Sequence, residues 1–230
     1  MLKVENLNQS YGDSRTLWDI SIEVPAGQCT CVMGRNGVGK TTLLQCLMGT
    51  LPLASGKIEF KGEHIENLKP SSRSRLGIGY VPQGREIFSQ MTVEENLRLG
   101  LVARQGRAAE VPESVYTLFP VLKNMLKRRG GDLSGGQQQQ LAIGRALALQ
   151  PSLLILDEPE EGIQPNIVQQ ITAVIEGLTT EGMTILVTSQ KLPFVKKVGN
   201  RFVMLDKGRV VADNSMDNLD DKLVEKHMRL

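Results

Sequence analysis

The sequence has few aromatic residues and no long hydrophobic run. Aromatic residues make up 4% of its 230 positions, which argues against a surface that stacks the bases of a single-stranded nucleic acid. No apolar stretch approaches the ~18 residues that a transmembrane helix needs, and the N-terminal residues lack the apolar segment of a secretory signal. We therefore expect a cytosolic chain that can still dock on a membrane protein.

The sequence also has few cysteines and histidines and a small net charge. The three cysteines, Cys29, Cys31 and Cys46, lack the spacing of a metal site, so we expect reduced thiols in the core. The net charge is only +2, and the basic clusters are short and lie far apart in the sequence. We expect these clusters to be solvated surface, without a nucleic-acid partner; they are Arg73–Arg75, Lys127–Arg129 and Lys196–Lys197.

A glycine-rich segment joins a predicted strand, Cys29–Met33, to a predicted helix, Thr42–Met48. It fits the pattern G-x-x-x-x-G-K-[ST] of a phosphate-binding loop. The segment consists of Gly34, Arg35, Asn36, Gly37, Val38, Gly39, Lys40, Thr41 and Thr42. Its glycines let successive backbone N–H groups converge on phosphates at the positive end of the helix. We expect Lys40 to reach the β- and γ-phosphates of a nucleotide and the Thr41 hydroxyl to hold Mg²⁺.

The remaining pattern predicts an α/β fold with one helical insertion. Apolar runs predict buried strands at Leu76–Val81, Leu153–Leu156 and Thr184–Thr188. From Thr92, which forms a capping box with Glu95, no strand signal occurs before Gly131. We therefore divide the chain into an α/β core, residues 1–91 and 132–230, and a helical subdomain, residues 92–131. The last residues, 216–230, predict an amphipathic helix of unknown role.

Two further segments carry polar groups that suit nucleotide chemistry. Ser134 and Gln137 form a capping box at the start of a predicted helix, and Gly135 and Gly136 leave backbone N–H groups free there. This segment is either a second anion site or a plain helix cap. Asp157 and Glu158 follow the buried strand 153–156, where ligand-binding groups of α/β sheets lie. We expect Asp157 to hold Mg²⁺ and Glu158 to orient the attacking water. The alternative is a solvated acidic turn, since Glu160 and Glu161 follow.

Taken in order, the phosphate loop, Gln83, Leu133-Ser134-Gly135-Gly136-Gln137 and the strand ending in Asp157-Glu158 resemble the ATP-binding subunits of ABC transporters over nearly the whole chain. The pentapeptide 133–137, called the signature below, is the specific part. The resemblance implies a P-loop NTPase core with an antiparallel β-subdomain and an inserted α-helical subdomain, and an ATPase that uses ATP and Mg²⁺. It also implies that Tyr11 stacks on adenine and that Gln83 contacts Mg²⁺ and senses the membrane partner.

The same resemblance implies a head-to-tail dimer. In it, the signature of one subunit faces the γ-phosphate that Lys40 of the other subunit holds. The segments 80–88, 137–140 and 161–165 are similar to the branched-chain amino-acid and urea/short-amide uptake group, of which the urea type is our first choice. That group implies a second ATPase subunit, identical or not, two transmembrane permease subunits, an external solute-binding protein and a place on the inner face of the cell membrane. The solute itself is not encoded in this chain.

Three residues depart from the family pattern. Gln190 stands where most members have histidine, or Ser189 does if the alignment shifts by one, and a glutamine can bind a γ-phosphate but cannot carry a proton. We expect Gln190 to take part in a slower hydrolysis. Gln164 and Glu160 replace the usual Asp and Thr. Two alternatives stay open: a degenerate nucleotide-binding regulatory subunit, and a soluble ABC ATPase outside transport, although the chain has neither a tandem unit nor a long coiled-coil insertion.

Overall fold

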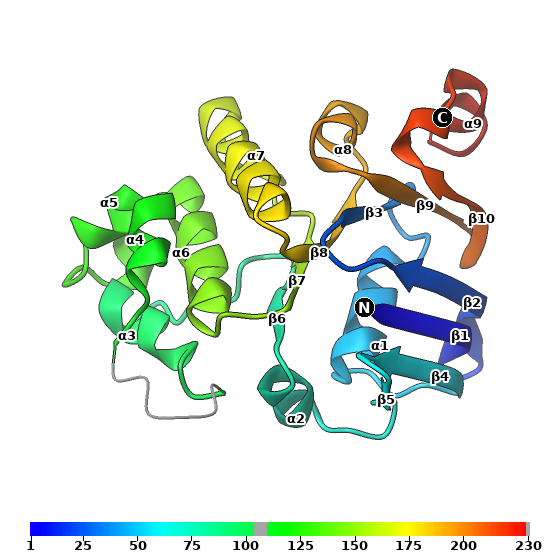
Figure 1. Ribbon diagram of the computed structural model, residues 1–230, viewed down its shortest axis with the longest axis horizontal. Coiled ribbons are helices and arrows are strands. Elements are labelled where there is room, and N and C mark those ends of the chain that lie inside the picture. The colour runs from blue at the N-terminus through cyan, green and yellow to red at the C-terminus, as the bar shows by residue number, and fades with distance from the viewer. Residues whose placement is uncertain (104–109, 229–230) are drawn as a thin grey trace.

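The fold contains two sheets and a separate group of helices (Figure 1). The computed structural model describes residues 1–103 and 110–228. The smaller sheet is antiparallel and has the order β2-β1-β4-β5. Its strands are β1 (Leu2–Tyr11), β2 (Ser14–Val24), β4 (Ser55–Phe60) and β5 (Glu63–His64).

The larger sheet has the order β10-β9-β3-β8-β7-β6 and is parallel except for β10. Its strands are β3 (Cys29–Met33), β6 (Ile78–Val81), β7 (Leu153–Asp157), β8 (Thr184–Ser189), β9 (Arg201–Asp206) and β10 (Arg209–Ser215). Every residue of β3, β7 and β8 is buried, because both faces of a parallel sheet are covered. The carboxyl ends of these three strands therefore meet at one edge of the sheet.

The buried strands send alternate side chains to two cores. In β3, Cys29, Cys31 and Met33 pack on the side of the later helices, while Val32 packs with the antiparallel sheet and the first helix. The helices that surround the larger sheet are α1 (Lys40–Met48), α2 (Pro70–Arg75), α7 (Pro165–Thr180), α8 (Leu192–Val198) and α9 (Asp221–Met228). The cysteines are free and buried, as predicted.

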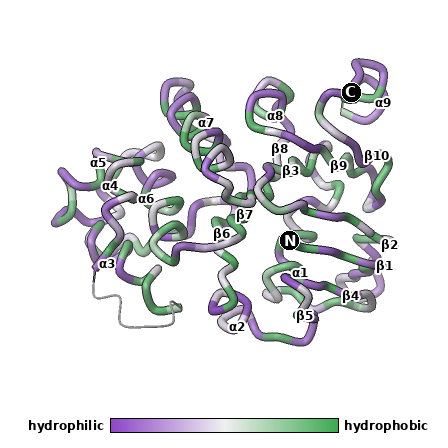
Figure 2. Tube along the Cα trace, viewed as in Figure 1, coloured by the Kyte–Doolittle hydropathy of each residue, from purple (hydrophilic) through white to green (hydrophobic). Residues whose placement is uncertain are grey.

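Helix α7 carries both hydrophobic and hydrophilic residues along its length (Figure 2). The buried residues of α7 recur at helical spacing, which places one face of the helix on the core; they are Ile171, Thr172, Val174, Ile175 and Leu178. In the part of the chain that the structure describes, no helix combines the length and apolar character needed to cross a bilayer.

Residues between β6 and β7 form the group of helices on the left of Figure 1. These are α3 (Val93–Leu99), α4 (Glu113–Leu118), α5 (Pro120–Lys123), a short 3₁₀ helix (Gly130–Asp132) and α6 (Gly135–Ala148). The capping box predicted at Thr92 is present: the Thr92 hydroxyl accepts from the Glu95 N–H at 3.2 Å, and the Glu95 carboxylate accepts from the Thr92 N–H at 2.7 Å.

Three predictions are wrong in detail. The strand expected from Leu76 begins at Ile78, because the Leu76 and Gly77 N–H groups bond to the last carbonyls of α2. The terminal helix does not begin at Met216: residues Met216–Asn218 form a 3₁₀ turn, since the Met216 N–H is held by the Asn200 carbonyl, and α9 follows. Residues 229–230 of that predicted helix lie outside the described residues. Arg73, expected on the surface, is buried, and its guanidinium donates four hydrogen bonds to backbone carbonyl groups.

Candidate functional site

The predicted phosphate loop joins the end of β3 to the first residue of α1. Gly34 and Gly39 have φ values of +148° and +107°, which lie in the region that favours glycine. A Cβ atom on Gly34 would lie 2.5 Å from the Leu205 carbonyl oxygen, so the loop passes too close to β9 for any side chain. Because the loop ends at the positive end of α1, its N–H groups are placed to receive phosphate oxygens.

Lys40 lies inside this loop. Its ammonium group donates to the carbonyl oxygens of Gly34 at 2.9 Å and Arg35 at 3.1 Å, and it forms an ion pair with Glu158 Oε1 at 3.0 Å. A hollow of about 270 Å³ opens over the loop. It is lined by Thr16, Asn36, Gly37, Gly39, Lys40, Thr41, Thr42, Gln83 and Glu158. The structure therefore brings loop residues, Gln83 and Glu158 to one cavity, and adds Thr16.

The acidic pair at the end of β7 is buried, which rules out a solvated acidic turn for these two residues. Asp157 is 1% exposed and Glu158 7%. Asp157 Oδ1 accepts from the Thr188 hydroxyl at 2.5 Å, and the Glu158 N–H donates to the same hydroxyl at 3.0 Å. Burial raises the pKa of Asp157 above its ordinary value, while hydrogen bonds from Thr188 and Thr41 oppose that rise. Sequence reasoning missed Thr188, whose role depends on the pairing of β7 with β8.

The donor set fits a magnesium ion. Asp157 Oδ2 is buried and has no hydrogen-bond partner among the described residues, and the Thr41 hydroxyl lies close enough to Asp157 to influence its pKa. Carboxylate and hydroxyl oxygens are the ligands that Mg²⁺ prefers. No group of three histidine, cysteine, aspartate or glutamate side chains in the described residues could hold a metal, so the other ligands would come from the Gln83 amide oxygen, from phosphate or from water.

Gln83 and Tyr11 are exposed, Gln83 in the loop after β6 and Tyr11 at the last position of β1. Gln83 lines the hollow, and its amide donates to Glu161 Oε2 at 2.7 Å, which joins the loop after β6 to the loop after β7. Tyr11 is 51% exposed and its hydroxyl donates to Gln45 Oε1 at 3.4 Å. The Tyr11 ring is therefore not part of the core, and it is accessible for stacking at the end of β1.

The signature occupies a different place. Ser134 caps α6: its hydroxyl accepts from the Gln137 N–H at 3.3 Å, and Gln137 Oε1 accepts from the Ser134 N–H at 2.9 Å. Leu133 is buried, whereas Ser134, Gly135, Gly136 and Gln137 line a second hollow of about 330 Å³ together with Gly162 to Gln164. In Figure 1, α6 lies on one side of β6 and β7 and α1 on the other. Among the described residues, none lines both hollows.

Gln190 follows β8 and is exposed, and it is absent from the lining of the phosphate-loop hollow. Ser189, its alternative, is buried and donates to the Glu160 carboxylate. Both residues lie at the carboxyl edge of the sheet, because Ser189 pairs with Met33 directly before the phosphate loop.

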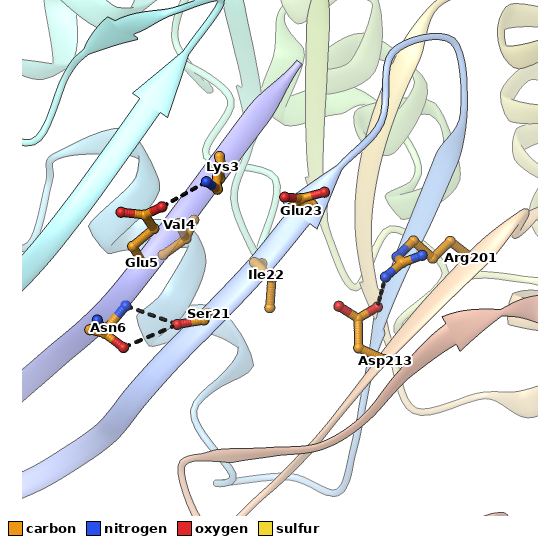
Figure 3. Close-up of a pocket in the computed structure, with 9 residues that line it drawn as sticks. All are labelled: Lys3, Val4, Glu5, Asn6, Ser21, Ile22, Glu23, Arg201 and Asp213. Atoms are coloured by element: carbon orange, nitrogen blue, oxygen red, sulfur yellow. Dashed lines mark hydrogen bonds and ion pairs between the residues drawn. The ribbon is translucent and has the colours of Figure 1, made fainter.

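Another hollow, of about 520 Å³, lies between β1–β2 and β9–β10 (Figure 3). Both cationic groups that line it are paired: Lys3 with Glu5 at 2.7 Å, and Arg201 with Asp213 at 2.7 Å. None of the predicted site residues lines it. It lacks the free cationic groups that a phosphate site requires, so the phosphate-loop hollow is the candidate active site.

Comparisons with known proteins agree with this geometry. The ABC transporter family model matches residues 17–161. A high-affinity branched-chain amino acid transport ATP-binding protein of Pseudomonas aeruginosa is 42% identical over 94% of this chain and 93% of its own. A glutamate/aspartate import ATP-binding protein of Escherichia coli K12 is 32% identical over 96% and 93%. A crystal structure of an ABC transporter ATP-binding cassette in its ADP conformation has a TM-score of 0.83 and 28% identity, covering 98% of this chain and 97% of that one. The chain therefore belongs to the ABC transporter family, and it is one of the family's ATP-binding, ATP-hydrolysing proteins.

Proposed function

We propose that this chain is the energy-coupling ATPase subunit of an importer for amino acids or small amides. The observation that carries the proposal is the convergence of Lys40, Glu158 and Gln83 on one hollow at the carboxyl edge of the sheet. The names of the P. aeruginosa and E. coli relatives favour amino acids as the solute. Urea or a short amide rests only on the motif resemblance and is the second candidate.

In the proposed reaction, backbone N–H groups of residues 34–42 and the Lys40 ammonium bind the phosphates of ATP. Thr41, Asp157 and Gln83 would hold Mg²⁺, which would neutralise phosphate charge. Glu158 orients the attacking water. Since Lys40 pairs with Glu158 at 3.0 Å, a γ-phosphate that takes the ammonium group leaves the Glu158 carboxylate free to accept a hydrogen bond from that water. Tyr11 stacks on the adenine, and Gln190, which carries no charge, contributes less than a histidine would.

The separation of the two hollows supports a head-to-tail pair of subunits. The signature, Leu133 to Gln137, would complete the ATP site of a second ATPase subunit, identical or not. The signature of that second subunit would complete the ATP site of this chain. We propose residues 1–91 and 132–230 as the catalytic core and 92–131 as the helical subdomain. Two permease subunits and an external binding protein would complete the assembly at the inner face of the cell membrane, and Gln83 would respond to the permease.

Complementation tests the cross-subunit arrangement. Lys40→Ala disables the phosphate loop, and Ser134→Arg disables the signature, so each variant alone should be inactive. A mixture forms some dimers in which the intact loop of one subunit faces the intact signature of the other, and these dimers should hydrolyse ATP. If the signature instead acted within its own subunit, the mixture would be as inactive as the separate variants.

Solute uptake tests the importer. A strain without this chain would receive the wild type, Glu158→Gln or the control Glu181→Gln, which alters an exposed carboxylate outside the site. We expect the wild type and the control to restore uptake of radiolabelled leucine, and Glu158→Gln not to do so. Restored uptake of urea instead would assign the short-amide alternative, and restored uptake of neither leucine, glutamate nor urea would contradict the proposal.

A further inference from the structure

Glu160 is a buried carboxylate close to the candidate catalytic residue. It lies two positions after Glu158 and is 1% exposed. Its Oε1 accepts a hydrogen bond from the Ser189 hydroxyl, whereas its Oε2 is buried without a hydrogen-bond partner among the described residues. Burial raises the pKa of the Glu160 carboxyl, and the Ser189 hydrogen bond opposes the rise. Burying such a group costs free energy, so its contacts call for a physical explanation.

The contacts of Glu160 lie on both sides of Gln190. The Ser189 hydroxyl that donates to Glu160 also accepts from the Lys191 N–H at 2.9 Å. The Lys191 ammonium donates to the Glu160 carbonyl oxygen at 3.1 Å. Gln190 is therefore carried by a short loop whose residues before and after it are both bonded to Glu160.

The same two loops are joined a second time, closer to the sheet. The Glu158 N–H donates to the Thr188 carbonyl at 3.2 Å and to the Thr188 hydroxyl at 3.0 Å. Glu158 has a φ of +45°, a conformation that a residue other than glycine keeps only when its surroundings enforce it. Thr188 fixes the segment before this strained residue, and Glu160 fixes the segment after it.

We propose that Glu160 is a positioning residue for ATP hydrolysis: its bonds to Ser189 and Lys191 hold the loop of Glu158 and the loop of Gln190 in one relative arrangement. This inference rests on the proposed function, in which Glu158 orients the attacking water. Glu160 is not a lining residue of the hollow and acts only through the backbone that it fixes. The opposing account is that the Glu160–Ser189 hydrogen bond stabilises the fold and has no effect on turnover.

Steady-state hydrolysis by the purified full chain separates these accounts. Glu160→Ala and Ser189→Ala should each lower kcat about 10- to 100-fold, the range expected when a reacting group is misplaced by about 1 Å. The KM for ATP should stay within about twofold, because the phosphate loop is untouched. Glu160→Gln keeps an oxygen that can accept from Ser189 and should retain most of the wild-type kcat. The double variant should lose no more than the worse single variant, because both changes break one interaction.

Several results would overturn the inference. Wild-type kcat in folded Glu160→Ala, a raised KM with unchanged kcat, or losses that multiply in the double variant would each do so. The melting temperature of each variant, with Glu181→Gln as control, shows whether a loss of activity is caused by unfolding. If only unfolded variants lose activity, Glu160 stabilises the fold and has no positioning role. Glu158→Gln in the same assay distinguishes the two proposals: if it turns over like the wild type, the proposed function fails, and if it is inactive while Glu160→Ala is fully active, only this inference fails.

Discussion

Replacing Arg73 by methionine should destabilise the protein substantially, although Arg73 lies away from the candidate active site. The side chain is 2% exposed, and its guanidinium donates to the carbonyl oxygens of Cys46 and Leu47 at 2.7 Å, Glu66 at 2.9 Å and Leu68 at 3.0 Å. Two of these carbonyls belong to the last turn of α1, the helix that begins at Lys40. Arg73 thus satisfies the carboxyl end of the helix whose amino end forms the phosphate site.

The size of the effect follows from the carbonyls that methionine leaves without this donor. The Cys46 carbonyl keeps a bond to the Gly49 N–H at 3.1 Å, so three carbonyls lose a donor for which the structure shows no comparable replacement. An unsatisfied buried polar group costs about 1–3 kcal/mol, and two of the three are only partly buried. Methionine fills most of the volume and avoids the cost of burying a charge. We therefore expect a loss of about 3 kcal/mol in the free energy of unfolding.

Urea denaturation followed by circular dichroism measures this loss. With a slope of about 3 kcal/mol per M, the midpoint should fall by roughly 1 M. Arg75→Met is the matched control, because Arg75 is exposed on the same short helix and should change stability by less than about 0.5 kcal/mol. A loss below about 1 kcal/mol for Arg73→Met, or an equal loss for both variants, would refute the reasoning.

Two other substitutions test the site itself. Asp157→Asn should stabilise the protein without nucleotide or metal at neutral pH, because burial raises the pKa of Asp157 and ionisation in the folded state therefore costs free energy. With a raised folded pKa, the wild type keeps the stability of a protonated Asp157 at low pH and loses it as the pH rises through that pKa, so the advantage of Asp157→Asn should shrink on acidification and vanish below about pH 4. Urea titrations in EDTA at several pH values would measure this advantage. An advantage that grew on acidification would contradict the prediction. Tyr11→Ala should raise the KM for ATP about 10-fold, with kcat and melting temperature unchanged, because the half-exposed side chain would lose its stacking on adenine and, within the fold, only a long exposed hydrogen bond to Gln45. An unchanged KM in steady-state assays would remove Tyr11 from the site.

The sequence was sufficient to predict the parts of the site that depend on local pattern. Apolar runs identified β3, β7 and β8, because a strand buried on both faces carries mostly apolar residues on both. Hydroxyl residues three positions before Glu95 and Gln137 identified both capping boxes. Those elements placed the phosphate loop and the Asp157–Glu158 pair correctly at strand ends.

What the sequence could not show depends on contacts between distant segments. Thr188 contacts Asp157 only because β8 pairs with β7, and that strand order is not written in either strand alone. Arg73 stands between serine residues in a basic cluster, which is typical of surface, and its burial depends on the end of α1 lying over α2. Glu160 belongs to an acidic run and was assigned with it to a possible solvated turn, whereas Ser189, 29 positions later, holds it in the interior.

The central claim, an ATPase in which Glu158 orients the attacking water, is tested most directly by Mg²⁺-dependent ATP hydrolysis of the purified wild type and Glu158→Gln. Glu158→Gln keeps the size of the side chain but removes the carboxylate that accepts from water. We expect a measurable wild-type rate and a loss of about 100-fold or more in the variant, with ATP still bound. Equal measurable rates in the two proteins would contradict the role of Glu158. ATP binding by both proteins without turnover by either would contradict the account and favour a nucleotide-binding regulatory subunit.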